Sequence, residues 1–241
     1  GVHVTDGRGS VRVANVNSAA QKSDFLVSVE NLTGELPNCG ATSLIVSWMG
    51  DDLRCGNCTI RPKVERDTED GLNQPWRSGG LNRFNAEIVP RDAGGAPVYG
   101  GTPSDQSVIE AIRGLQEAGQ EVLYYPFILM DQIEGNGLPD PYSDATDQPV
   151  LPWRGRITGD RAPGQPNSTD GTAANRASVE AFFGAAQASD FAIQGEFIFY
   201  TGPSEWSYSK FILHCAALCK VAGGVEAFCI GSEMRGLTQM R

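Results

Sequence analysis

The sequence lacks the features of a membrane protein and of a nucleic-acid-binding protein. No stretch approaches the roughly 20 apolar residues that a membrane-spanning helix needs, and no basic start followed by an apolar block marks a secretory signal. No basic run is longer than two residues, and the formal net charge is −10. Because a nucleic-acid binder normally presents a basic surface, we expect a soluble chain that binds no nucleic acid and inserts into no membrane.

Cysteine is too sparse for a disulfide scaffold, with six residues in a chain of 241. Cys55 and Cys58 have the C-x-x-C spacing of a zinc or redox pair, and Cys39, Cys215 or Cys219 could complete a thiolate site. A second such pair is absent, and cysteine on an apolar helix face is usually a small buried hydrophobe. We therefore predict reduced thiols without a metal or cofactor, and keep a zinc site as the alternative.

The length and the 40% hydrophobic content suffice for one domain with a full core, but not for two comfortable ones. We expect a single domain over residues 1–241, with 1–20 the least clearly assigned part. The chain starts at Gly1 rather than Met and stops at Arg241, just past a strand-like segment. We therefore expect it to be part of a longer protein, with the domain cut at its C-terminal end.

One unit recurs three times along the chain: a capped amphipathic helix, a glycine, and then an apolar run rich in β-formers. In the middle copy Thr102 is followed by Pro103, which is typical of an N-cap before the first helical position. An apolar stripe follows, made of Val108, Ile109, Ile112 and Leu115. Gly119 suits the left-handed position that ends a helix, and a strand is predicted over 121–128.

The copies on either side follow the same order. Ser23 or Asp24 can cap the upstream helix, and Gly223 with Gly224 can end the downstream one. We expect helices starting near 24 and spanning about 204–221, a shorter helix over 173–183, and strands over 43–48 and 225–230.

Strands that are apolar throughout are typical of a parallel sheet that is buried on both faces by helices. The predicted fold class is therefore α/β, with the three strands adjacent in one curved sheet. The repeats are much longer than a bare βα unit, so residues 50–101 and 130–203 are predicted to be insertions after the strands. They should lie at the end of the sheet where α/β proteins build their sites.

Each predicted strand is followed by a carboxylate, namely Asp51, Asp131 and Glu233. Because proline inside a central strand would lose a ladder hydrogen bond, Pro126 should lie near the end of the second strand. Such carboxylates often cap a helix or hold a loop, and Asp51 or Asp52 could simply pair with Arg54.

Aromatic residues at the same strand ends favour a sugar ligand. The rings that could offer flat faces belong to Trp48, Tyr125, Phe127 and Trp153. Sugar rings bind such faces, while carboxylates and the guanidinium groups of Arg54 and Arg235 satisfy the hydroxyls. An acidic pocket with aromatic walls therefore favours a neutral polyol over a phosphate, although Trp48 could equally be a core residue.

Three segments closely resemble the TIM-barrel-like domain of gene transfer agent and phage-tail tip, or host-specificity, proteins. They are 46–54 (VSWMGDDLR), 125–131 (YPFILMD) and 228–237 (FCIGSEMRGL). The resemblance runs through most of the chain, including 151–157 and 205–208, and thins over the first twenty or so residues.

The wider kinship is with retaining glycoside hydrolases, in which an Ile-Gly-[Ser/Thr]-Glu run ends the fourth barrel strand and supplies the general acid/base. The resemblance implies the N-terminal half of a glycosidase-like (β/α)8 barrel with long insertions after the strands, and Glu233 as that acid/base. The first barrel strand would lie in residues 2–14 or outside the chain. Ser232 stands where typical glycosidases have asparagine. Retaining hydrolysis also needs a second carboxyl group roughly 5 to 5.5 Å away, which the resemblance places beyond Arg241.

The resemblance also implies a setting: the tail or baseplate of a phage-like particle, assembled with other tail proteins in the bacterial cytoplasm and released to meet a cell-envelope polysaccharide. We expect the isolated chain to be inactive. Burial of Glu233 against nearby aromatic rings should keep a general acid protonated. The candidate substrate contacts are Trp48, Asp51, Tyr125, Asp131, Trp206 and Arg235. Two alternatives stay open: an inactive structural or receptor-binding barrel of the tail, and an unrelated open-sheet α/β domain.

Overall fold

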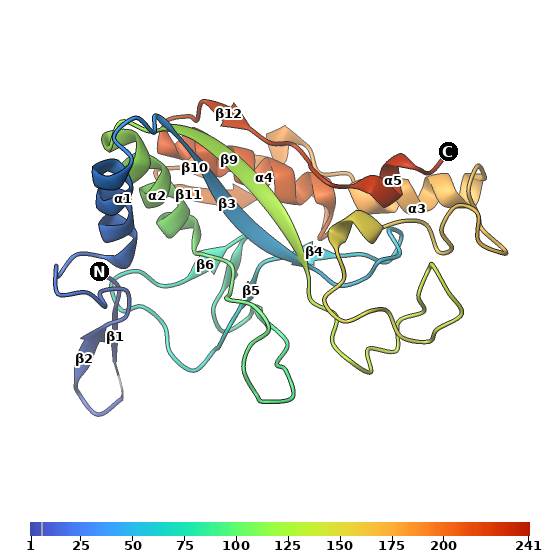
Figure 1. Ribbon diagram of the computed structural model, residues 1–241, viewed down its shortest axis with the longest axis horizontal. Helices are drawn as coiled ribbons and strands as arrows, with labels where there is room; N and C mark the ends of the chain where they lie inside the picture. The colour runs from blue at the N-terminus through green and yellow to red at the C-terminus, as the bar shows by residue number, and fades with distance from the viewer. Residues whose placement is uncertain (6) are drawn as a thin grey trace.

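The computed structural model describes residues 1–5 and 7–241 and shows a mixed α/β fold (Figure 1). Its largest sheet has the strand order β12-β9-β3-β4. These strands are β12 (Ala227–Phe228), β9 (Glu121–Met130), β3 (Ala41–Gly50) and β4 (Ile60–Arg61). The first three are parallel to one another, and β4 is antiparallel to β3. The predicted parallel and adjacent arrangement of the three apolar strands is therefore confirmed.

The other strands form small two-stranded sheets. They pair β1 (His3–Thr5) with β2 (Val11–Val13), β5 (Lys63–Val64) with β8 (Glu87–Ile88), β6 (Arg77–Ser78) with β7 (Leu81–Asn82), and β10 (Phe191–Gln194) with β11 (Phe197–Tyr200). The helices are α1 (Asp24–Glu35), α2 (Asp105–Glu117), α3 (Ala173–Phe183), α4 (Tyr208–Ala222) and α5 (Arg235–Thr238), with 3-10 turns η1 (Arg154–Arg156) and η2 (Ala188–Asp190). In the described part of the chain, none of these helices has the length and apolar character of a membrane span.

The predicted half of a (β/α)8 barrel is wrong. Over residues 1–5 and 7–241 the strands form an open sheet and several small, scattered ones, and no barrel closes. The hairpin β1–β2 occupies the place of the possible first barrel strand, yet these two strands form a separate sheet and pair with no other described strand. At one edge of the main sheet, β12 has two residues where six were expected. The chain leaves the sheet after Cys229, whose N–H donates to the Tyr124 carbonyl oxygen.

One face of the sheet is covered and the other is open. Successive side chains of a strand point to opposite faces, and α2 and α4 contact one face of β9. Val46 and Tyr124 are buried on that side, whereas Ile45 is 54% exposed and Leu123 is 38% exposed on the other. In Figure 1, α4 lies behind β3 and β9, and the near face of these strands carries no helix. The expectation that both faces are buried is therefore not met.

Pro126 does not end its strand, contrary to the prediction. The strand β9 continues to Met130, and Pro126 lies opposite Val46 of β3. Even-numbered residues of β9 direct their backbone groups toward β12, as the bond from Cys229 N–H to the Tyr124 carbonyl shows. Because the ladder to β12 is already finished at that point, the missing N–H of Pro126 costs no strand pairing.

The helices α1, α2 and α4 start after serine caps, and α3 starts after the threonine cap Thr172. Ser23 caps α1 as predicted, and α3 spans the predicted residues. The N-cap of α2 is Ser104 rather than Thr102, whose hydroxyl instead donates to the Ser47 carbonyl at 2.9 Å. The helix α4 begins after its cap Ser207 and ends at Gly223, which has a φ of 112°. The helices α2 and α4 pack against the covered face of the sheet. A ligand can therefore reach the sheet only at the ends of its strands or on its open face.

Candidate functional site

Glu233 lies in the connection between β12 and α5, on a backbone with a φ of 55°. This region is uncommon for a residue other than glycine, and such strain concentrates at functional positions. Its carboxylate oxygen Oε2 accepts from Trp153 Nε1 at 2.8 Å and is ion-paired with Arg154 Nη2 at 3.1 Å. No partner of its second oxygen, Oε1, occurs among the described residues, and the side chain is 54% exposed.

The position of this carboxylate depends on its ion pair with Arg154. The Arg154 guanidinium is buried and lies 3.7 Å from the centre of the Phe127 ring, which stabilises a cation by its π-face. The same group donates to Ser232 Oγ at 3.1 Å and to Tyr125 Oη at 3.4 Å. A buried charge needs such partners. Contacts with Tyr125 and Phe127 of β9 therefore fix the position of Arg154, and Arg154 in turn fixes the position of the Glu233 carboxylate.

Tyr125 and Phe127 bring this arrangement onto the open face of the sheet. They are alternate residues of β9 and therefore point to the same side, opposite to the buried Tyr124. The Tyr125 hydroxyl is hydrogen-bonded to Ser232 Oγ. Ser232, the residue that replaces the usual glycosidase asparagine, thus ties the segment after β12 to β9.

Trp153 gives the site an exposed aromatic surface. Its side chain is 45% exposed while its Nε1–H is held by Glu233. A Cβ added at Gly155 would lie 2.5 Å from atoms of the Trp153 ring, so only glycine there permits this ring position. We name Tyr125, Trp153, Arg154, Ser232 and Glu233 the Glu233 cluster. It combines an exposed ring with a fixed carboxylate that keeps one free oxygen.

Trp48 and Trp206 lie on the covered side of the sheet, away from this cluster. Trp48 is 1% exposed, and its ring centre lies 5.9 Å from that of Trp206 and 5.2 Å from that of Phe211. Lys210 Nζ lies 3.8 Å from the Trp206 ring, and burial lowers the pKa of Lys210 to about 8. The alternative that Trp48 is a core residue is therefore the one that the structure supports.

Asp51 and Asp131 are engaged in contacts within the protein. The Asp131 carboxylate is buried and pairs with Lys63 Nζ at 2.8 Å. Burial raises the pKa of Asp131, although Lys63 acts in the opposite direction. Asp51 accepts from the backbone N–H of Thr59 at 2.7 Å and also from the Thr59 hydroxyl. Both carboxylates thus hold loop segments that follow the strands.

Asp52 pairs with Arg54 at 2.6 Å, as one alternative had it. Its other contact, from Gln148 Nε2 at 2.7 Å, joins the segments that follow β3 and β9. Arg235 is exposed at the first turn of α5. Of the six predicted substrate contacts, Tyr125 is the one linked to Glu233 in the described structure. Arg154 donates to the Tyr125 hydroxyl and is ion-paired with Glu233.

Sequence reasoning missed Arg154 and considered Trp153 only as one of several aromatic rings. Both belong to a Trp-Arg-Gly run inside the long segment after β9. The available signal was this run within 151–157, which carried part of the family resemblance. Nothing local to it indicates contact with a glutamate 80 positions later.

Four of the six cysteines, Cys55, Cys58, Cys215 and Cys219, are buried and behave as small hydrophobes. Burial raises the pKa of Cys55 to about 11 and that of Cys219 to about 12, and it raises the pKa of Cys58 still further. A metal ligand must be a thiolate, which this environment disfavours. Across 1–5 and 7–241, no group of three or more His, Cys, Asp or Glu side chains is placed to hold an ion.

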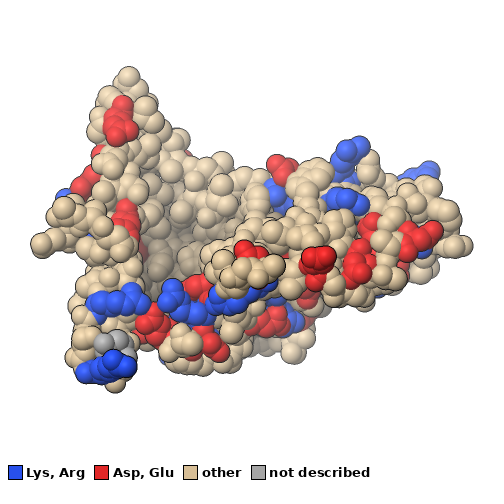
Figure 2. Space-filling model, turned by 60° about the horizontal axis from the view of Figure 1, so that its bottom comes forward, with Lys and Arg blue, Asp and Glu red and all other residues tan. Residues whose placement is uncertain are grey.

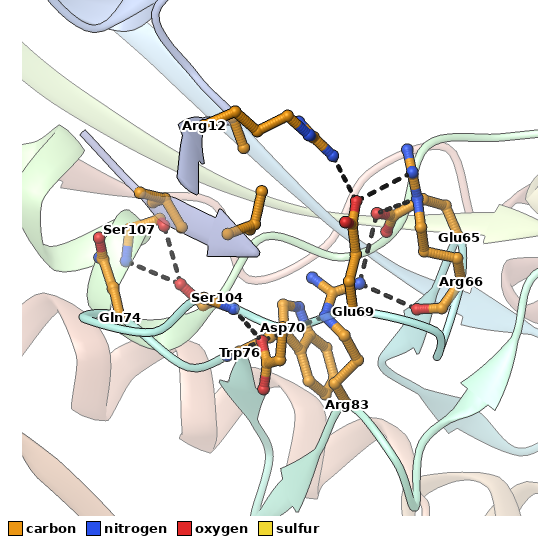
Figure 3. A pocket seen from close by; sticks show the side chains of 14 residues that line it. Arg12, Glu65, Arg66, Glu69, Asp70, Gln74, Trp76, Arg83, Ser104 and Ser107 are labelled. Carbon is orange, nitrogen blue, oxygen red and sulfur yellow. Dashed lines mark hydrogen bonds and ion pairs between the residues drawn. The ribbon is translucent and has the colours of Figure 1, made fainter. Parts of the chain in front are cut away.

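A pocket of about 280 Å³ lies between the β1–β2 hairpin and the segment 65–83 (Figure 3). Its charged side chains pair with one another: Glu69 with Arg12 and Arg66, and Arg83 with Glu65 and Asp70. These charges are paired within the protein, and the ion pair between Arg12 and Glu69 attaches the β1–β2 hairpin to the segment 65–83. On the face shown in Figure 2, basic and acidic side chains are likewise interspersed in one band.

Comparison with known families agrees with part of the resemblance. Residues 206–241 match the family model described as the GTA TIM-barrel-like domain, where GTA stands for gene transfer agent. The match includes Ser232 and Glu233 but covers a short stretch of the chain. No curated protein matches the sequence.

Proposed function

We propose that this chain is a glycan-recognising module of a gene transfer agent-like particle, and that the Glu233 cluster contacts the sugar. The observation that carries this proposal is the exposed Trp153 ring beside a carboxylate that the buried Arg154 holds in place. A sugar can stack on the ring while a hydroxyl donates to the free Glu233 Oε1. The partners are prearranged by Arg154, so little side-chain entropy is lost on binding.

The proposed setting is the tail or baseplate of the particle, assembled in the bacterial cytoplasm with other tail proteins and released to meet a cell envelope. The match of residues 206–241 to the gene transfer agent family model supports the gene transfer agent part of this setting. The ligand would be a cell-envelope polysaccharide, from capsule, lipopolysaccharide or peptidoglycan. Binding in this setting attaches the particle to its target cell.

Hydrolysis with Glu233 as general acid/base is the second candidate, favoured by the place of Glu233 after a parallel strand within the matched stretch. Two aspects of the geometry weigh against it. A general acid benefits from burial, and the Glu233 side chain is about half exposed. The carboxylate oxygen Oε2 is also engaged by Trp153 and Arg154, so it is not available to a leaving group. Glycan binding is therefore the function that the geometry supports better.

The test is binding of the chain to an array of capsule, lipopolysaccharide and peptidoglycan glycans. Trp153→Ala and Glu233→Gln should each weaken binding at least about tenfold, since each removes a contact worth roughly 1.4 kcal/mol or more. The control is Glu226→Gln, which changes an exposed glutamate outside the cluster. Unchanged binding in both cluster variants would refute the proposal.

Release of new reducing ends from the bound glycan separates the two candidates. Binding without release supports recognition alone. Release that falls at least about a hundredfold in Glu233→Gln would support the hydrolytic candidate instead, in line with general-acid contributions.

A further inference from the structure

The charge around the Glu233 cluster differs from the acidic pocket that the sequence predicts. That prediction, and the neutral ligand that it favours, depended on the carboxylates of Asp51, Asp52 and Asp131. All three are engaged in contacts within the protein. At the cluster itself, the Glu233 carboxylate is balanced by the buried guanidinium of Arg154. The net charge that a ligand meets here is therefore set by the neighbouring residues.

Arg235 is a positively charged neighbour of this balanced pair. It is exposed at the first turn of α5, two positions after Glu233 in the chain. In the part of the chain that the structure describes, its guanidinium forms no ion pair. All its donors are thus available to a ligand.

Packing of α5 on η1 brings Arg235 beside the exposed aromatic ring of the cluster. Gly236 is buried there, and a Cβ added to it would lie 3.1 Å from the Gly155 carbonyl oxygen and 3.0 Å from the Tyr142 hydroxyl. The Trp153 ring lies against Gly155 in turn. Arg235 is the exposed residue next to Gly236, so it lies at the edge of the surface that contains Trp153.

Arg156 adds a second positive charge at this edge. Its guanidinium lies 4.5 Å from the centre of the Tyr142 ring, and its Nη2 is 3.7 Å from Asp140 Oδ1, which is a long ion pair. Burial raises the pKa of Tyr142, while the charges of Arg156 and Arg235 act in the opposite direction, so both are within electrostatic reach of this ring. Because Arg156 is shared with Asp140, the charge that stays uncompensated here is that of Arg235.

An uncompensated guanidinium beside an exposed aromatic ring matches a sugar that carries one negative charge. A guanidinium binds a planar carboxylate through two parallel hydrogen bonds, while the sugar ring stacks on Trp153. A phosphate monoester carries about −1.5 to −2 charges at neutral pH. This exceeds the charge of Arg235 and would place the excess next to Glu233. A carboxylate is therefore the better match.

We propose that Arg235 selects a hexuronic acid unit of the glycan, with the uronate carboxylate on Arg235, the sugar ring on Trp153 and a hydroxyl on Glu233 Oε1. This inference rests on the proposed function of the Glu233 cluster and names the substrate class of that site. Arg235 is exposed, so binding should weaken as the ionic strength rises, because salt screens an exposed ion pair.

The experiment is calorimetric titration of the whole chain with tetramers of galacturonate, glucuronate and mannuronate. Each is compared with its carboxyl-reduced form, in which a primary alcohol replaces every carboxylate. We expect at least one uronate tetramer to bind at least about tenfold more tightly than its carboxyl-reduced form. Arg235→Gln should bring the ratio of the two affinities to within about threefold. Arg235→Lys keeps the charge without the planar fork and should retain part of the ratio.

A matched control separates a direct contact from an effect of net charge. Arg77→Gln removes an exposed arginine on β6, outside the Glu233 cluster, and changes the net charge by the same amount. It should leave the ratio of affinities unchanged. Equal affinities for the charged and carboxyl-reduced tetramers, or a ratio that Arg77→Gln and Arg235→Gln lower equally, would overturn the inference. Binding of neutral or phosphorylated glycans alone would also overturn it.

Failure of the proposed function has a different signature. That function requires Trp153→Ala to weaken the binding of charged and carboxyl-reduced tetramers alike, whereas Arg235→Gln changes their ratio. Unchanged affinity for both forms in Trp153→Ala would refute the proposed function, whatever the ratio. If no glycan binds the chain, both are refuted.

Discussion

Trp153 donates its indole N–H to Glu233 across 2.8 Å, joining two residues that are 80 positions apart in the chain. The contact connects the long segment after β9 to the segment after β12. It leaves the Trp153 ring exposed and one Glu233 oxygen free, which is the arrangement on which the proposed glycan contact depends.

Trp48 should be a stability residue and Trp153 a binding residue. Trp48→Ala should lower the free energy of unfolding by about 3 to 5 kcal/mol, because it removes a fully buried ring. Trp153→Ala should cost about 1 kcal/mol or less, because that ring is about half exposed. Urea denaturation of both variants measures the difference, and similar losses would contradict the assignment of Trp48 to the core.

Lys210 should make stability depend on alkaline pH. Burial lowers its folded-state pKa to about 8, below the roughly 10.4 of an unfolded lysine. Between these values the unfolded chain binds more protons, so this residue makes stability rise with pH across the window. Below about pH 8 Lys210 is protonated in both the folded and the unfolded chain, so the full cost of burying its charge lowers the stability of the folded state.

The Lys210→Met variant isolates this effect, because other titrating groups are shared with the wild type. The difference obtained by subtracting the wild-type unfolding free energy from that of the variant should be highest near neutral pH. It should fall by about 1 to 3 kcal/mol on approaching pH 10. Urea denaturation at a series of pH values measures the difference. A difference that stays constant over this range would contradict the assigned burial of Lys210.

The thiols should react in two groups. Cys39 and Cys229 are partly exposed, whereas Cys55, Cys58, Cys215 and Cys219 are buried. Burial raises the pKa of the buried thiols, so few of them are in the reactive thiolate form. An alkylating reagent followed by mass spectrometry of the native chain should therefore modify Cys39 and Cys229 first. Rapid modification of Cys55 and Cys58 would revive the alternative of a reactive or metal-binding pair.

Local patterns in the sequence predict the elements whose formation is local. The helix α3 and the strands β3 and β9 follow from apolar periodicity with polar or glycine boundaries, and their observed spans agree closely. Thr102 was a plausible cap by the same rules. Ser104 is the cap instead because the Thr102 hydroxyl bonds to the Ser47 carbonyl, a contact that the local sequence does not reveal.

Features that depend on distant partners were not predictable in this way. The apolar run 225–230 has the composition of a full strand, but β12 pairs for only two residues because the chain turns away toward α5. Whether a sheet closes depends on such edges, so the barrel prediction failed there. Arg154 was missed because its role arises only when Phe127, Ser232 and Glu233 meet around it.

The most direct test of the proposed function is the indole N–H signal of Trp153 in a ¹H–¹⁵N NMR spectrum. The chain has four tryptophans, so the indole signals can be assigned by substitution. Oligosaccharide fragments of capsule, lipopolysaccharide and peptidoglycan are added in turn. We predict that at least one fragment shifts the Trp153 signal progressively while the buried Trp48 signal stays in place, and that Glu233→Gln weakens this response at least tenfold. A Trp153 signal that no fragment moves would contradict the account.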